Sequence, residues 1–367
     1  MTKLLSDTQF LFAAANAQEP NVADLPSLFF FSILGLLCIG YIIWRLSDTS
    51  KDTAFFRFFF PPRRQRTQPW GIPTIVFAVF LVLWCAIMAQ GVVQLALPGK
   101  IAFLNDTEAV DNNTSAVDNL EPDEAPAQPM FTKEKLSEQH SLTILMQKAD
   151  RHPSVIVLCF LAVVIVAPLS EELFFRVLTQ GGIEAAIRRN PNLRGSAKKM
   201  AIVLTALFFA AIHFRFPQKG IDDQFFEFLF KAFLAKIVGD LSAIAIMILV
   251  LRKWHRIRWS DIGFWDFKRL PRDIAGAFLL FLTIFLPISV IHSLVRVLFE
   301  CIDVPASMAD PVPLFLFALV LGTLYSRTRR FASVFFLHAF FNLYSFLFLL
   351  YMTFNPISAT LTSFGKF

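Results

Sequence analysis

The stretch SVIVLCFLAVVIVAPLSEELFFRVLTQ, from Ser154 to Gln180, contains three charged residues inside an otherwise apolar run. A run of this length can form a helix that crosses a bilayer, which takes roughly 20 residues. The adjacent acids Glu171 and Glu172 are costly in lipid unless they have partners or a function. The stretch therefore predicts a membrane helix that carries a polar site.

Seven further apolar runs occur in the chain, and 56% of its 367 residues are hydrophobic while only 17% are charged. Such a composition is too apolar for a water-soluble chain of this size. The period-two alternation of an outer-membrane barrel is not sustained. We therefore expect an all-α, polytopic transmembrane helix bundle with about eight spans, of which the fourth and seventh are short. The candidate spans are residues 25–46, 72–97, 154–180, 200–214, 225–251, 274–299, 312–326 and 331–352.

Lys and Arg are concentrated in alternate connections between these spans, namely residues 45–66, 188–199, 252–272 and 327–330. Basic connections are typical of the cytoplasmic side of a membrane. We therefore expect both termini on the non-cytoplasmic side. The net charge of +6 then reflects these connections, so we expect the lipid bilayer, and no nucleic acid, as a partner.

The polar and apolar segments also predict how the chain is divided. A signal peptide would explain Lys3 and the alanines that follow, but polar residues 6–9 interrupt the apolar stretch and disfavour cleavage. The expected parts are a non-cytoplasmic N-terminal segment (1–24), two transmembrane helices (25–97), an acidic non-cytoplasmic loop (98–153), a membrane core (154–352) and a C-terminal tail (353–367).

The two acids in the quoted stretch are expected to differ in whether they form an ion pair. Glu172 and Arg176 are four residues apart, which stacks them on one helical face as an ion pair. Glu171 turns about 100° away and has no such partner in the stretch. Pro168 is expected to kink the helix just before them. The alternative is that all three charges lie among lipid headgroups at the end of a span.

Two later spans contain histidines. Phe209-Ala-Ala-Ile-His213 ends the fourth apolar run, and His338-Ala-Phe-Phe-Asn342 places an imidazole and an amide on one helical face. Counted along the helices, Glu171 and these three groups all lie within about 10 to 20 Å of the cytoplasmic edge. We expect them to share a cavity, although a lone histidine such as His213 can also be a structural hydrogen-bonding residue.

A carboxylate, two imidazoles and an amide at one depth are suited to amide hydrolysis. Glu171 beside a histidine can take a proton from water, and His338 with Asn342 can stabilise an oxyanion. The same groups leave a zinc site open, with Glu171, His213 and His338 as ligands. GxSxG and HExxH signatures do not occur in the sequence.

The motifs EExxxR, FxxxH and HxxxN, at residues 171–176, 209–213 and 338–342, together resemble the CPBP family of intramembrane proteases. This family includes type II CAAX prenyl endopeptidases and bacteriocin-processing or self-immunity proteins. Residues 321–328 also look like the family's lead-in to its last motif, and the resemblance covers roughly residues 154–352. In this chain Val177 stands where the family often has Gly, and the interval between the two histidine motifs is long.

The resemblance implies a role for each motif residue. Glu171 and His213 would activate water, and His338 and Asn342 would stabilise the oxyanion or help bind the catalytic water or a metal ion. Members are commonly labelled metalloproteases, so zinc is a possible cofactor. Structural support of the site would come from Glu172, Arg176 and Phe209.

We therefore expect an intramembrane endopeptidase of the bacterial plasma membrane that cleaves membrane-embedded or lipid-anchored peptides and proteins. One alternative is a catalytically inactive immunity or scaffold protein on the same fold. Another is an ion- or proton-coupled transporter, for which the ionisable residues are Lys231, Lys236, Asp240, His292 and Arg296.

Overall fold

The structure is a computed structural model that describes residues 25–48, 54–62, 69–97, 145–146, 152–214, 223–257, 262–263, 268–302, 304 and 306–354. The N-terminal segment, most of the acidic loop and the C-terminal tail expected from the sequence lie outside these residues. Within the described residues, the secondary structure consists of helices and contains no strand. The helices are α2 (Leu25–Ser47), α3 (Ala54–Phe59), α4 (Ile72–Ala96), α8 (Pro153–Phe160), η3 (Leu161–Val166), α9 (Ala167–Glu172), η4 (Leu173–Gln180), α10 (Gly181–Arg188), α11 (Ala197–Ile212), α12 (Asp223–Leu249), η5 (Val250–Trp254), α13 (Leu270–Glu300), η6 (Ala306–Ala309), α14 (Pro311–Thr328) and α15 (Phe331–Phe354).

Seven spans in the described part of the chain are long and apolar enough to cross a membrane. They correspond to seven of the eight expected spans and confirm the polytopic all-α bundle. The remaining candidate, α11, has 16 residues. At 1.5 Å per residue it extends about 24 Å, which is short of the roughly 30 Å of hydrocarbon.

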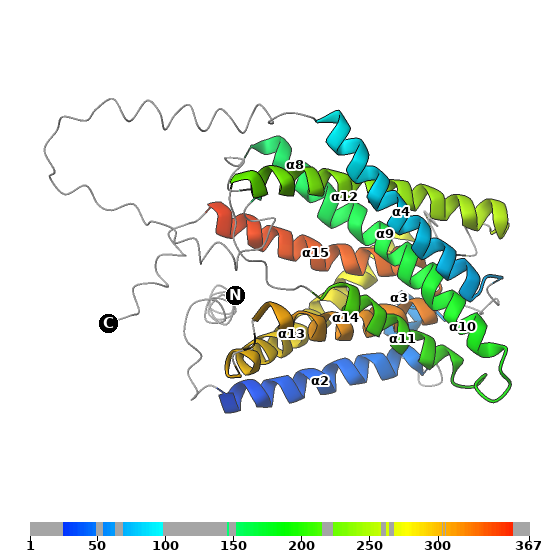
Figure 1. Cartoon of the computed structure of the whole chain (residues 1–367). Coiled ribbons are helices and arrows are strands. Elements are labelled where there is room, and N and C mark those ends of the chain that lie inside the picture. The colour runs from blue at the N-terminus through cyan, green and yellow to red at the C-terminus, as the bar shows by residue number, and fades with distance from the viewer. Residues whose placement is uncertain are drawn as a thin grey trace, which may run out of the picture.

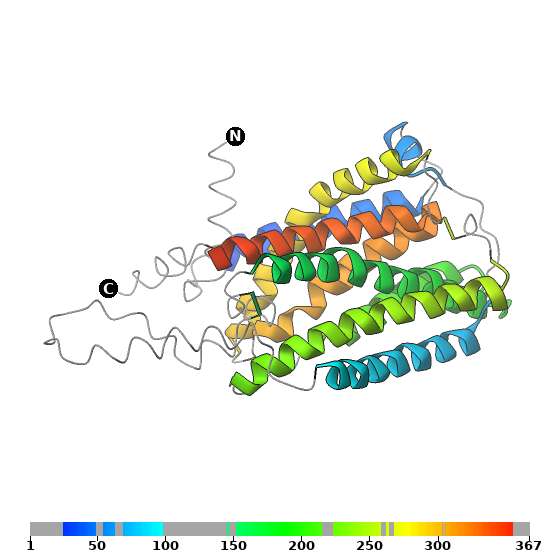
Figure 2. The same cartoon turned by 90° about the horizontal axis from the view of Figure 1, so that it is seen from above.

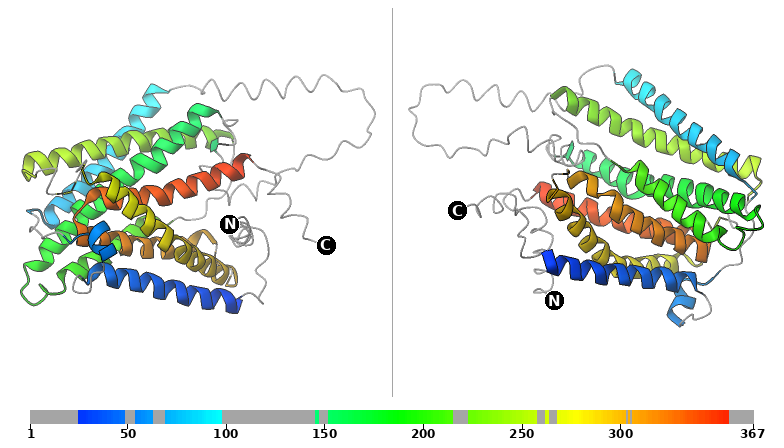
Figure 3. Two further views of the ribbon diagram at one scale, coloured as in Figure 1. Left: turned by 180° about the vertical axis from the view of Figure 1, so that it is seen from behind. Right: turned by 60° about the horizontal axis from the view of Figure 1, so that its bottom comes forward.

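The two N-terminal helices lie at opposite edges of the bundle (Figure 1, Figure 3). Helix α2 packs against α13, where a Cβ on Gly35 would come within 3.2 Å of the carbonyl oxygen of Pro287. Helix α4 lies along α12 (Figure 2), where a Cβ on Gly239 would come within 3.4 Å of the Cα of Ala86. Small residues allow such close approach between membrane helices, in which van der Waals packing drives association. The helices that carry the three motifs therefore lie between these two edges.

The span that carries the adjacent acids is one continuous helix with two wide segments. It runs from Pro153 to Arg188, eight residues beyond the end expected at Gln180. The π-helical segments η3 and η4 flank α9, which contains Glu171 and Glu172. Pro168 lacks a backbone N–H and its ring crowds the carbonyl group four residues earlier, which a wider turn relieves. Such π segments are frequent at functional sites.

Helices α2, α10 and α14 all end on the same side of the bundle, called here the basic end (Figure 1). Arg327 donates hydrogen bonds to the carbonyl oxygens of Phe60, at 2.7 Å, and of Arg45, at 3.3 Å. It thereby satisfies a carbonyl group that the last turn of α2 leaves without a helical partner. Glu184 accepts hydrogen bonds from Arg188 at 2.7 Å and from Arg329 at 2.6 Å. The connection between α14 and α15 is therefore fixed against both α2 and α10.

Candidate active site

Glu171 lies between two imidazoles that come from different helices. Its Oε2 atom is 3.7 Å from Nε2 of His213, at the end of α11, and 3.8 Å from Nε2 of His338, on α15. Both distances exceed a hydrogen bond. They are short enough for one water molecule to contact the carboxylate and both rings. The structure thus brings together three of the four residues that the sequence suggested for catalysis.

Glu171 lies near the middle of the long span and not at its end. Seventeen residues separate it from Arg188, where the span ends, and this corresponds to about 26 Å along the helix. The side chain of Glu171 is 20% exposed and that of His213 is 25% exposed, whereas His338 is almost completely buried at 5%. The carboxylate is therefore accessible from outside the protein yet far from the basic end.

Glu172 is fully buried and holds two partners. Its Oε2 accepts a hydrogen bond from Nε of Arg176 at 3.1 Å, and its Oε1 accepts one from Nδ1 of His338 at 2.9 Å. The guanidinium of Arg176 also lies over the ring of Phe209, at 5.6 Å from its centroid. The ion pair expected from the spacing is present. The bond to His338 was not expected, because 166 positions separate the two residues and no local pattern connects them.

His213 is oriented by its own helix. Its Nδ1 donates to the carbonyl oxygen of Phe209 at 2.7 Å, and the two rings lie 4.4 Å apart. Because a carbonyl oxygen only accepts, the proton is assigned to Nδ1, and Nε2 faces Glu171 with its lone pair. His213 follows the last residue of α11, so the short length of this helix places the ring at the depth of Glu171.

The side-chain amide of Asn342 bonds to the backbone of the long helix. Its Nδ2 donates to the carbonyl oxygen of Val163, at 2.8 Å, in the π-helical segment η3. The described contacts do not bring Asn342 against Glu171 or either imidazole. A wide helical turn frees carbonyl groups, and Asn342 satisfies one of them. A backbone group such as the carbonyl of Val163 has no sequence signature, so this contact could not be predicted.

The donor set does not meet the requirements of a metal site in the described part of the chain. No group of three or more His, Cys, Asp or Glu residues there has an arrangement that could hold a metal ion. Nε2 of each imidazole lies near Glu171, but the three residues do not form a three-ligand cluster.

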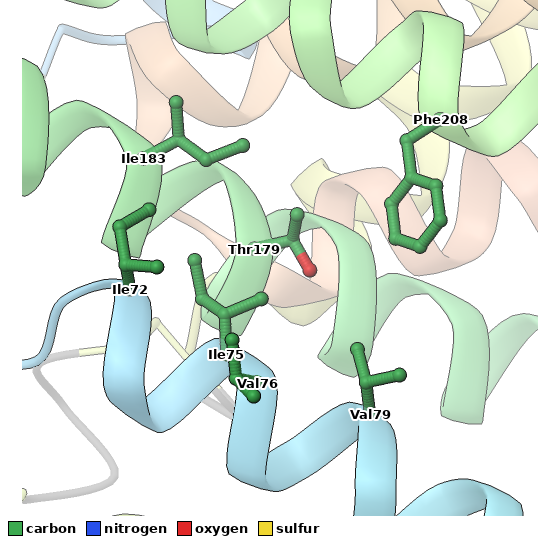
Figure 4. A pocket seen from close by; sticks show the side chains of 7 residues that line it. All are labelled: Ile72, Ile75, Val76, Val79, Thr179, Ile183 and Phe208. Carbon is green, nitrogen blue, oxygen red and sulfur yellow. The ribbon is translucent and has the colours of Figure 1, made fainter.

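An apolar groove of about 320 Å³ lies between α4, η4, α10 and α11 (Figure 4). One of its walls is Phe208, whose ring lies 5.6 Å from that of Phe175 and which precedes Phe209 in the chain. The single polar side chain in the lining is Thr179. The lining residues are Ile72, Ile75, Val76, Val79, Thr179, Ile183 and Phe208.

Three of the five residues considered for transport form ion pairs in the structure. Lys236 and Asp240 form an ion pair of 2.8 Å within α12, as their spacing predicts. His292 on α13 lies 3.2 Å from Asp310, which immediately precedes α14. These pairs give Lys236, Asp240 and His292 a neighbour and do not involve Glu171.

A comparison with protein families places the motif helices in a known group. The family model described as type II CAAX prenyl endopeptidase Rce1-like matches residues 153–344, which is more than half of the chain. All three motifs lie within the matched residues. No curated protein and no solved structure matches the chain.

Proposed function

Because the chain belongs to the Rce1-like family of type II CAAX prenyl endopeptidases, we propose that it hydrolyses peptide bonds of membrane-embedded or lipid-anchored substrates at Glu171, His213 and His338. Members of this family are CAAX-type intramembrane proteases that act on peptides. The assignment of these three residues rests on the position of one carboxylate oxygen between two imidazole nitrogens, at 3.7 and 3.8 Å.

In the proposed reaction, Glu171 is the general base. It takes a proton from a water molecule that donates its other hydrogen to Nε2 of His213. The water oxygen attacks the carbonyl carbon of the scissile bond, and the carbonyl electron pair moves onto oxygen. Glu171 then returns the proton to the leaving nitrogen. The carbon–nitrogen bond breaks, and a carboxylic acid and an amine are released.

The oxyanion of this intermediate needs a donor, and His338 is placed to supply one. With a proton on each ring nitrogen, His338 donates from Nε2 to the oxyanion while Glu172 accepts from Nδ1. The buried carboxylate of Glu172 stabilises the positive ring, as carboxylates do in other hydrolases. Asn342 uses one amide hydrogen for Val163 and has a second for the same oxyanion.

We propose that the apolar part of the substrate lies in the groove beside α4. The groove is lined almost entirely by aliphatic and aromatic side chains and is close to the rings that pack around Arg176. An aliphatic chain of a lipid-anchored peptide is the kind of group that such a lining retains. The peptide would then reach Glu171 from the lipid side.

The basic end would face the cytoplasm of a bacterial cell, with both termini on the opposite side of the plasma membrane. This proposal rests on the positive-inside rule, because α2, α10 and α14 end together where Lys and Arg are abundant. Reporter enzymes fused to each terminus test it, since active cytoplasmic reporters at both ends would contradict it.

The decisive experiment is the substitution Glu171→Gln in the purified full chain with a lipidated peptide substrate. Loss of the base should lower turnover by about 10²- to 10⁴-fold, with an unchanged melting temperature. Asp240→Asn, which removes a different acid in a span, should retain turnover. If Glu171→Gln retained wild-type turnover, the assignment would be wrong. If folded wild-type protein cleaved no lipidated peptide, the inactive-partner alternative would be favoured.

A further inference from the structure

A line of polar residues runs from the candidate site to the basic end. The long span carries Glu172, Arg176, Gln180, Glu184 and Arg188 at intervals of four residues. The first four side chains are at most 4% exposed. This is an unusual pattern for a membrane helix, in which buried polar groups are rare and usually functional.

Helices α11 and α14 present polar groups to this line. Nε2 of Gln180 donates to the carbonyl oxygen of Gly322 at 2.9 Å, and Arg329 bonds to Glu184. Ser326 follows Gly322 by one turn of α14, and Thr205 precedes Phe209 by one turn of α11. We refer to this set as the polar seam, which consists of Arg176, Gln180, Thr205, Gly322, Ser326 and Arg329.

The side chains of the seam have polar atoms with unused hydrogen-bonding capacity. The described residues provide no hydrogen-bond partner for seven of these atoms, and the residues that carry them are at most 5% exposed. Buried polar groups in proteins are nearly always satisfied by protein atoms or by ordered water. The seven atoms are Nη1 and Nη2 of Arg176, Oε1 of Gln180, Oγ1 of Thr205, Oγ of Ser326, and Nε and Nη1 of Arg329.

Gly322 marks the point where two of these atoms converge. A Cβ built on Gly322 would lie 3.1 Å from Oε1 of Gln180 and 3.5 Å from Nη1 of Arg176. One atom is an acceptor and the other is a donor. The glycine therefore lets a complementary pair approach α14 closely, and such a pair suits a small ligand able both to donate and to accept.

We propose that the polar seam binds a file of ordered water molecules that links the Glu172–Arg176 pair to the basic end. Water fits better than an ion, because the unsatisfied atoms include donors, an acceptor and hydroxyl groups. Given the proposed hydrolytic function, the file supplies water to a site that is surrounded by lipid.

Radiolytic hydroxyl-radical labelling of the full chain in nanodiscs tests the file directly, because radicals form from water beside the labelled residue. Ile202 contacts the seam at Gly322 and is 7% exposed, whereas Ile288 in α13 is 6% exposed and lies in the apolar core. We expect Ile202 to be labelled severalfold faster than Ile288. Equal labelling of the two residues would overturn the proposal.

The substitution Gly322→Ala places a Cβ against Oε1 of Gln180 and Cγ2 of Ile202, and Gly40→Ala is its control, since a Cβ on Gly40 meets nothing within 4 Å. Gly322→Ala should abolish the excess labelling at Ile202 and lower kcat more than it changes KM, while Gly40→Ala should do neither. Unchanged labelling in folded Gly322→Ala protein would contradict the proposal. If this variant does not fold, the wild-type comparison decides. Because labelling does not depend on turnover, a failure of the protease assignment would leave this result intact.

Discussion

Glu172 and His338 are joined by a hydrogen bond of 2.9 Å between Oε1 and Nδ1, although they lie on helices 166 positions apart. The bond fixes the ring of His338 so that its other nitrogen faces Glu171. The adjacent acids therefore differ in role. Glu172 is turned into the protein and orients His338, whereas Glu171 is turned toward an accessible space.

We predict that Glu172→Gln destabilises the protein more than Glu171→Gln does. Glu172 neutralises a buried guanidinium, and removing one partner of a buried ion pair costs about 3–5 kcal/mol. Thermal unfolding in detergent should therefore show a clearly lower melting temperature for Glu172→Gln alone. Equal melting temperatures for the two variants would argue against the structural role of Glu172.

Asn342→Leu should affect both activity and stability. Loss of an oxyanion donor lowers kcat by about 10²- to 10³-fold, and loss of the bond to Val163 costs about 1 kcal/mol. Ser345→Ala is a suitable control, since Ser345 is exposed and its hydroxyl bonds within its own helix. A variant with lower stability and intact kcat would limit Asn342 to holding η3.

Filling the apolar groove should weaken substrate binding. Val79→Phe places an aromatic ring in the space beside Thr179, so KM for a lipidated peptide should rise while kcat changes little. Val92→Phe is the control. Val92 lies further along α4 and its side chain is 55% exposed, so this substitution should leave KM unchanged. Kinetics with lipidated and unlipidated peptides of one sequence provide the measurement.

Chelation should leave the activity intact. The donor atoms do not assemble a three-ligand cluster in the described residues, and the proposed mechanism uses Glu171 and the imidazoles alone. We expect the purified active enzyme to contain far less than one equivalent of zinc and to retain turnover in a chelator. Loss of turnover that added zinc restores would contradict this mechanism.

His255 should make the protein less stable in mild acid. Burial lowers the pKa of His255 from its ordinary value of 6.5, so the unfolded chain binds a proton there at a higher pH than the folded protein does. Stability is therefore lost as pH falls from about 6.5 toward the lower folded pKa. Melting temperatures at pH 7.5 and 5.5 should differ less in His255→Gln than in wild type. An identical difference in both proteins would remove His255 as a cause.

The sequence alone determined the class of fold and most of the motif residues. Hydropathy and length are local properties, so they located the spans, and the four-residue spacing was sufficient to predict the Glu172–Arg176 pair. The extension of the third span to Arg188 was missed, because the apolar run in the sequence ends near Gln180. In the structure Glu184 forms ion pairs with both Arg188 and Arg329.

Only the tertiary structure decided which polar groups meet. The rotation of each helix about its axis, the wide turns around Pro168 and the short length of α11 together placed Glu171 between two imidazoles. The same packing directed Asn342 to Val163 and Gln180 to Gly322. The last two contacts join residues more than 100 positions apart. The geometry of all these contacts depends on how whole helices pack, which no local pattern in a sequence specifies.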